Sequence, residues 1–247
     1  MKNVLFVFML CITSPIAVIA EDKPVQQLKI GRMSVGRILY LGNSITLHGP
    51  APQIGWTGNF GMAASAEDKD YVHLLTAEIA KSAGARPEIM VRNIADFERG
   101  YESYVAAEAL KKELEFRPDL VVVAIGENVA ELKTEEDQTK YAAAFAGLLR
   151  TLKQSEQTEI FVRTSFWANQ VKDDIMRKAA SGAGATLVDL AKYSGDPSLA
   201  ASAERKIEHA GVAAHPGDKG MKAIADAIFA AMKGRAKMKD EQNANRN

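Results

Sequence analysis

Ser44 lies in a segment where a short apolar run, Arg37 to Leu41, ends at Gly42 and a polar turn follows. A hydroxyl at the carboxyl end of a strand can stand clear of the backbone, with free N–H groups around it. A nucleophilic serine needs that geometry, because its oxygen must reach a carbonyl carbon while nearby donors hold the developing oxyanion. Glycine, asparagine and serine are also common in ordinary turns, so this segment alone leaves both interpretations open.

His215 is the candidate partner of Ser44, although it lies far downstream in the segment His-Pro-Gly-Asp-Lys-Gly-Met. Histidine titrates near neutrality, as the base for a serine must. His48 follows Ser44 by four residues and could line the pocket or act as a base; an ordinary loop histidine is the alternative. His209 and His215 have no third ligand beside them in the sequence, so we expect no metal site.

Apolar runs alternate with helical spacing along the chain, which predicts a parallel sheet covered by helices on both faces in one domain. The run Leu120–Ile125 is continuously apolar, as expected for a central strand that is buried on both faces. The predicted strands are 37–41, 88–94, 120–125, 160–163 and 186–190, and the predicted helices are 70–83, 101–116, 135–153, 170–180 and 217–233.

Polar clusters follow three of these strands, at Gly42–Thr46, Asn93–Gly100 and Gly126–Asn128, and His215 precedes the last helix. In open parallel sheets, active sites form at the carboxyl ends of the strands. We therefore expect all four segments to meet at one edge of the sheet.

The order of these motifs resembles the SGNH (GDSL-type) hydrolase superfamily over residues 37–233. Three segments carry the resemblance: Gly-Asn-Ser-Ile-Thr at 42–46, Gly-Glu-Asn at 126–128 and the His-Pro segment at 215. The first differs from the family's Gly-Asp-Ser-Ile-Thr at Asn43. The resemblance implies a three-layer α/β/α sandwich with a mostly parallel five-stranded sheet, the flavodoxin-like fold of that superfamily.

The same resemblance implies roles for individual residues. Ser44 would be the nucleophile and His215 the general base, with no cofactor. The backbone N–H of Ser44 and the side-chain amide of Asn128 would bind the oxyanion, together with the N–H of a glycine after the second strand, which we assign to Gly100. An asparagine amide suits this role because it is a neutral N–H donor.

Val212 departs from the family pattern, which usually has an aspartate three residues before the histidine. In the serine-protease template, disturbing that acid costs roughly 10⁴ in turnover. Three interpretations stay open: a Ser–His dyad oriented by a backbone carbonyl, a carboxylate from elsewhere, or lost catalysis. The candidate carboxylates are Glu98, Asp96 and Glu127; Glu98 and Glu127 could equally brace a loop.

The expected function is a serine esterase that removes acyl groups, most simply O-acetyl groups, from carbohydrates. Trp56 and Trp167 could each stack on a sugar ring or simply pack, and we expect Trp56 to face the substrate. The alternatives are a lysophospholipase or thioesterase, which would need a long apolar pocket, an acyltransferase, and a non-catalytic carbohydrate-binding protein.

Residues 1–20 have a positive start and an apolar centre, and they end in Val-Ile-Ala before Glu21. This pattern predicts a signal peptide, a secreted or periplasmic protein and no membrane span after cleavage. A retained membrane anchor and a lipoprotein attached at Cys11 are the alternatives. We expect the hydrolase-like domain at 21–234 and a disordered Lys- and Asn-rich tail at 235–247.

The 247-residue chain has 31 basic and 31 acidic residues, so its formal charge is zero and no basic patch suggests a nucleic-acid partner. Cys11 is the only cysteine, which excludes thiolate chemistry after cleavage. The expected partner is a small-molecule or polysaccharide ester. The sequence does not predict an oligomeric state.

Overall fold

The computed structural model describes residues 28–244 and contains a five-stranded parallel sheet in the order β4-β3-β5-β6-β7. This confirms the predicted fold class. The strands are β3 Arg37–Gly42, β4 Glu88–Asn93, β5 Leu120–Ala124, β6 Glu159–Arg163 and β7 Thr186–Val188. Strands β1 Lys29–Ile30 and β2 Met33–Ser34 form a separate antiparallel hairpin.

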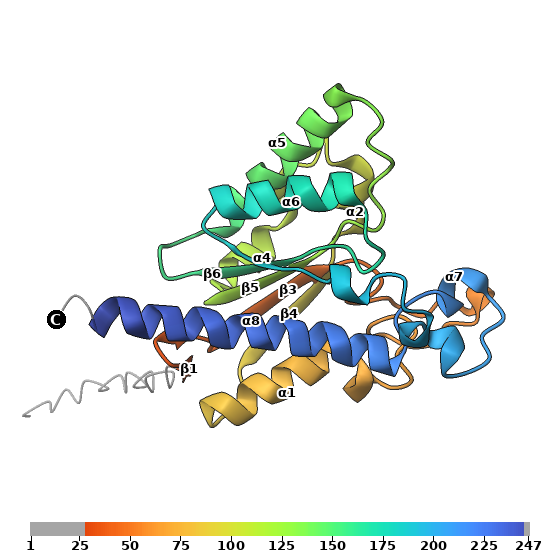
Figure 1. Ribbon diagram of the computed structural model, residues 1–247, viewed down its shortest axis with the longest axis horizontal. Helices are drawn as coiled ribbons and strands as arrows, with labels where there is room; N and C mark the ends of the chain where they lie inside the picture. The colour runs from red at the N-terminus through yellow and green to blue at the C-terminus, as the bar shows by residue number, and fades with distance from the viewer. Residues whose placement is uncertain (1–27, 245–247) are drawn as a thin grey trace, which may run out of the picture.

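Helices cover both faces of the sheet (Figure 1). Helices α1 Tyr71–Ala83 and α8 Asp218–Ala244 lie on one face, and α5 Glu135–Leu152 and α6 Gln170–Gly182 lie on the other. The two cores follow from strand periodicity: Val122 joins the α1/α8 core, whereas Val121 and Val123 join the α5/α6 core. Short 3₁₀ turns lie at Pro52–Ile54, Glu67–Lys69, Ala191–Tyr193, Pro197–Leu199 and Ala201–Ala203.

The prediction of one helix over 101–116 is wrong. That range contains two short helices instead, α3 Ala106–Ala109 and α4 Lys111–Glu115, and a third short helix, α2 Ala95–Gly100, comes before it. A turn follows α2, and the rings of Phe97 and Tyr104 then meet edge to face with centroids 5.3 Å apart. Bending lets Phe97, Ala106 and Leu110 enter the same core, so tertiary packing overrides the local spacing.

The prediction of a disordered tail from residue 235 is wrong as far as residue 244, because α8 continues to Ala244. Arg235 Nε donates to Glu159 Oε2 at 2.9 Å, Lys239 pairs with the other oxygen of Glu159, and Ala236 is buried. The composition of this segment gives no sign of these contacts to β6.

The predicted signal peptide, residues 1–20, lies outside the described residues. Within 28–244, none of the helices has both the length and the apolar character that crossing a bilayer requires.

Candidate active site

Ser44 stands on a tight turn directly after β3. Gly42 is required there, because a Cβ at this position would lie 1.8 Å from the hydroxyl oxygen of Thr46. The turn is closed by Asn43, whose carbonyl accepts from the N–H of Thr46 at 2.9 Å and whose side-chain Oδ1 accepts from the N–H of Ile45 at 3.1 Å. The strand and this turn together hold the Ser44 hydroxyl at the carboxyl edge of the sheet.

Ser44 and His215 meet, although 171 residues separate them. The Oγ of Ser44 lies 2.8 Å from Nε2 of His215, and Nδ1 of His215 lies 2.6 Å from the backbone carbonyl oxygen of Gly211. Because a carbonyl oxygen can only accept, Nδ1 carries the ring proton and Nε2 presents its lone pair to the serine hydroxyl. This is the tautomer that a general base requires.

Burial lowers the pKa of His215 below its ordinary value of 6.5, and the hydrogen bond to Gly211 opposes that shift in part. The imidazole is therefore neutral at neutral pH. A neutral ring can take a proton from Ser44, so the electrostatics agree with the geometry.

A pocket of about 410 Å³ opens beside this pair. Its lining mixes polar and apolar side chains from several elements: Ser44, His48, Ile54, Met62, Asn93, Ala95, Asp96, Arg99, His209, Gly211, Val212 and His215. Three of the four segments expected at this edge contribute to it. His48 thus lines the pocket, where its Nδ1 lies 2.6 Å from the Gly49 carbonyl oxygen.

Gly100 is not brought to the pocket. It is the last residue of α2, whereas Ala95 and Asp96 at the start of that helix line the pocket. A backbone N–H donor can come from any residue except proline, so the sequence does not single out glycine for this role. In this structure the N–H of Ala95 donates to Oδ1 of Asn93 at 2.9 Å.

Asn128 does not line the pocket itself, but it contacts Arg99, which does, and its amide has a fixed orientation. Its Nδ2 donates to Oε2 of Glu98 at 2.7 Å, and its Oδ1 accepts from Nη2 of Arg99 at 3.3 Å. The amide nitrogen has a second hydrogen beyond the one on Glu98. Among the hydrogen bonds of residues 28–244, that second hydrogen has no acceptor.

Glu98 and Glu127 do not take the position of a triad acid, because the carbonyl of Gly211 occupies Nδ1 of His215. Glu98 is 1% exposed and accepts from Asn43, Gly126 and Asn128. Asp96, the third candidate carboxylate, lines the pocket and accepts from the N–H of Phe97. All three bind backbone or side-chain amides around the site.

Glu127 forms a buried ion pair with Arg163, with Oε1 and Nη1 2.6 Å apart. Burial by itself would raise the pKa of Glu127, but the charge and hydrogen bonds of Arg163 outweigh it and lower that pKa. Asn43 joins the two glutamates, because its Nδ2 lies 2.7 Å from Glu127 Oε2 and 3.2 Å from Glu98 Oε1. An aspartate at 43 would place a third carboxylate there, which explains why asparagine suits this chain.

The expectation that Trp56 faces the substrate is wrong. Trp56 is 7% exposed, packs edge to face on Phe60 and donates its Nε1–H to the His48 carbonyl at 3.0 Å. Trp167 is 40% exposed instead, and its ring centroid lies 5.6 Å from that of His215. The exposed aromatic beside the Ser–His pair is therefore Trp167.

Val212 belongs to a small apolar cluster with Ala51, Trp56 and Met62. It lies in α7 Ala210–Ala213, the short helix that also presents the Gly211 carbonyl to His215. His209 caps that helix by accepting from the N–H of Val212 at 3.3 Å. Within residues 28–244, no three side chains of the metal-binding types are grouped to hold an ion.

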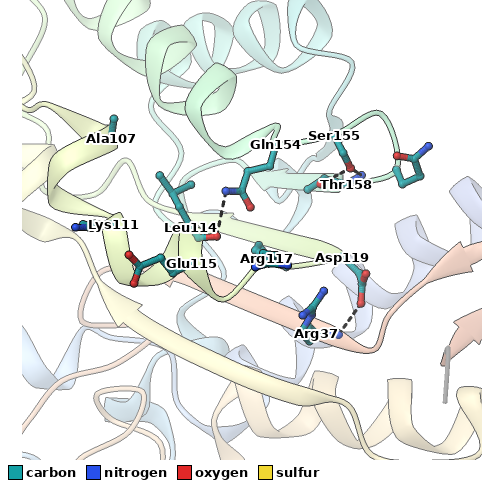
Figure 2. A pocket seen from close by; sticks show the side chains of 12 residues that line it. Arg37, Ala107, Lys111, Leu114, Glu115, Arg117, Asp119, Gln154, Ser155 and Thr158 are labelled. Atoms are coloured by element: carbon teal, nitrogen blue, oxygen red, sulfur yellow. Dashed lines mark hydrogen bonds between the residues drawn. The ribbon is translucent and has the colours of Figure 1, made fainter. Parts of the chain in front are cut away.

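A second pocket, of about 530 Å³, lies at the opposite edge of the sheet, near the amino ends of β3 and β5 (Figure 2). Figure 2 shows Arg37 and Asp119 at the start of these strands, where the N–H of Arg37 donates to Asp119 Oδ2 at 2.9 Å. Ser44 and His215 are not part of its lining. The two pockets are therefore at opposite ends of the strands.

Comparison with solved structures finds proteins of the same architecture. A putative GDSL-like lipase from Parabacteroides merdae matches with a TM-score of 0.53 and 18% sequence identity, covering 83% of this chain and 98% of that one. A lipase from a goat rumen metagenome matches with a TM-score of 0.52 and 14% identity, covering 81% of this chain and 99% of that one.

This chain has the SGNH hydrolase fold. A two-domain esterase active on acetylated mannans also matches, with a TM-score of 0.53 and 19% identity over 83% of this chain. The match spans about half of that esterase, 51% of its length. No protein-family model and no curated protein matches the sequence.

Proposed function

We propose that this protein is a serine ester hydrolase in which Ser44 is the nucleophile and His215 the general base. The observation that carries the proposal is the chain of contacts from Ser44 Oγ through the His215 ring to the Gly211 carbonyl, at 2.8 and 2.6 Å. Among the three interpretations of Val212, this contact favours a Ser–His dyad oriented by a backbone carbonyl.

The chemistry proceeds in two steps. His215 Nε2 takes the proton of Ser44 as Oγ attacks the ester carbonyl, and the imidazolium then gives that proton to the departing alcohol oxygen as the C–O bond breaks. Water attacks the acyl-Ser44 ester next, losing a proton to His215, and the acid leaves as Ser44 recovers its proton. The N–H of Ser44 and the free amide hydrogen of Asn128 bind the oxyanion in each step.

We infer that the substrates are short acyl esters of carbohydrates, most simply O-acetyl esters. Two observations support this substrate class. The pocket lining includes the charged side chains of Asp96 and Arg99, which suit a sugar and disfavour a long acyl chain. Trp167 stands exposed beside His215 and can stack on a sugar ring. The structurally similar esterase active on acetylated mannans is a third support.

We infer further that the protein acts outside the cytoplasm, secreted or in the periplasm, because residues 1–20 have the pattern of a signal peptide. Amino-terminal sequencing of the exported protein tests this inference. A mature chain that starts at Glu21 supports it, and an intact Met1 on the purified protein contradicts it.

The decisive experiment measures hydrolysis of p-nitrophenyl esters, from acetate to octanoate, by the mature chain and by Ser44→Ala and His215→Ala. We expect activity that is highest on acetate and falls roughly 10³-fold or more in both variants. Ser181→Ala, a change at an exposed serine on α6, is the matched control and should keep full activity. Equal activity in wild type and Ser44→Ala would contradict the proposal.

Acetylated oligosaccharides test the substrate class. Trp167→Ala should raise KM for an acetylated oligosaccharide several-fold while leaving p-nitrophenyl acetate hydrolysis nearly unchanged, because only the sugar needs the stacking surface. If both substrates lost activity equally, Trp167 would not be a sugar contact.

A further inference from the structure

We propose that Glu98 is the positioning residue for the oxyanion-binding amide of Asn128. The inference rests on the proposed function, since Asn128 binds an oxyanion only if Ser44 attacks esters. Glu98 forms no hydrogen bond with Ser44 or His215. Its effect on the reaction would therefore pass through Asn128.

The first argument is the burial of Glu98. Glu98 is 1% exposed. Within residues 28–244, no lysine or arginine forms an ion pair with it. Burying a carboxylate is costly unless hydrogen bonds replace its water. Four N–H donors do so here: Asn43 Nδ2 at 3.2 Å, Gly126 N at 2.7 Å, Asn128 N at 3.0 Å and Asn128 Nδ2 at 2.7 Å.

The second argument is where those donors come from. Three of the four belong to the turn Gly126–Asn128 after β5, and the fourth belongs to Asn43, next to Ser44. Helix α2, which carries Glu98, follows β4. One carboxylate thus fixes the relative positions of the two turns that hold the nucleophile and the oxyanion donor.

The third argument is the orientation of the Asn128 amide. An asparagine side chain can turn over and exchange its oxygen for its nitrogen, and an oxygen facing an oxyanion would repel it. Here the anionic Glu98 accepts from Nδ2, and the cationic Arg99 donates to Oδ1 at 3.3 Å. Glu98 can only accept a hydrogen bond and Arg99 can only donate one. The amide therefore forms both hydrogen bonds only when its nitrogen faces Glu98 and its oxygen faces Arg99.

The fourth argument is charge balance around the turn. Lys172 donates to the carbonyls of Gly126 and Val129, and Arg163 pairs with Glu127, so two buried cations offset the two glutamates. The turn is held from its N–H side by Glu98 and from its carbonyl side by Lys172. The turn that carries Asn128 is therefore held by charged side chains on both of its sides.

The test begins with Glu98→Gln, which keeps the shape of the side chain but replaces one acceptor oxygen with an N–H₂ group that faces other donors. We expect kcat on p-nitrophenyl acetate to fall by about 10- to 100-fold while KM stays within about threefold, because removing one oxyanion donor outright costs roughly 10²–10³. Glu113→Gln is the matched control. Glu113, on α4, is also buried but pairs with Arg92 of β4, so its change should leave kcat within about twofold.

A double-mutant cycle distinguishes positioning from a merely structural role. If Glu98 acts through Asn128, Glu98→Gln/Asn128→Ala should be no slower than Asn128→Ala alone. If the two losses multiply, Glu98 supports activity by another route and the proposal is overturned.

A readout without catalysis keeps the inference separate from the proposed function. In the wild-type NMR spectrum, the side-chain amide of Asn128, assigned by its absence in Asn128→Ala, should show one proton protected from exchange with water, unlike the exposed Asn59. Exchange as fast as that of Asn59 overturns the inference even if Glu98→Gln cannot be folded. Protection in a protein that hydrolyses no ester supports the positioning contact and contradicts the proposed function alone.

Discussion

His215 is oriented by a neutral carbonyl where a triad would use a carboxylate. The Gly211 carbonyl selects the same tautomer as an aspartate, because both only accept a hydrogen bond. It differs in charge, since a dipole stabilises the imidazolium less than a full negative charge does. The expected consequence is a weaker base with a lower pKa, which agrees with the direction that burial gives to His215.

This residue-scale argument predicts the pH dependence of kcat/KM. The active form of His215 is neutral, so activity should rise with pH as the imidazolium loses its proton and then reach a plateau. Because the pKa is lowered, the midpoint should lie below 6.5. The measurement is kcat/KM for p-nitrophenyl acetate, which does not itself titrate in this range. A midpoint above 6.5 would indicate a carboxylate beside His215 and would contradict the dyad.

Helix α7 shows why an aspartate at position 212 should not improve catalysis. Its backbone already satisfies Nδ1 of His215 through Gly211, while the side chain of Val212 packs among Ala51, Trp56 and Met62. A carboxylate at 212 would replace a side chain that packs in this apolar cluster. Sequence position alone therefore does not make residue 212 an acid site.

We accordingly predict that Val212→Asp lowers the free energy of unfolding by about 1–3 kcal/mol, because it buries an unpaired polar group, and does not raise kcat. Denaturant unfolding and ester hydrolysis measure the two effects. Val212→Ala, which removes packing without adding charge, separates the cavity from the charge and should cost less. An increase in kcat for Val212→Asp would show that the ring turns toward residue 212.

The elements differed in how well the sequence predicted them. Strand β5 was predictable because a continuous apolar run such as Leu120–Ala124 suits a strand that is buried on both faces. The helix over 101–116 was not, because the contact of Phe97 with Tyr104 depends on the fold around it. Local spacing carries no information about such contacts.

The residues of the candidate site also differ in how well the sequence predicted them. Ser44 and His215 could be singled out because their side-chain types carry the chemistry and lie in motifs. Backbone carbonyls such as that of Gly211 are present at every residue, so the residue types do not show which of them contacts His215. Trp56 and Trp167 are identical in type, and only packing decides that the first is buried and the second exposed.

Helix α8 links the two ends of the molecule (Figure 1). It begins just after His215, and its far end reaches the β1–β2 hairpin, where a Cβ at Gly31 would lie 2.6 Å from Asp240. On the way, Arg235 and Lys239 pair with Glu159 of β6, which is 2% exposed. The C-terminal half of this helix thus neutralises a charge that the sheet buries.

Truncation after Gly234 should therefore lower the free energy of unfolding by about 3–5 kcal/mol, because it leaves Glu159 buried without its cations. Denaturant unfolding at neutral pH measures the loss, and truncation after Ala244 is the matched control. Burial alone would raise the pKa of Glu159, but the hydrogen bonds from Lys239 and Arg235 outweigh it and lower that pKa below 4.5. A lowered folded-state pKa stabilises the protein above the unfolded value and loses that effect as pH falls through the folded one. The stability difference between the full and shortened chains should thus shrink in acid, whereas a difference independent of pH would mean that packing of α8, and not the ion pairs, holds its end.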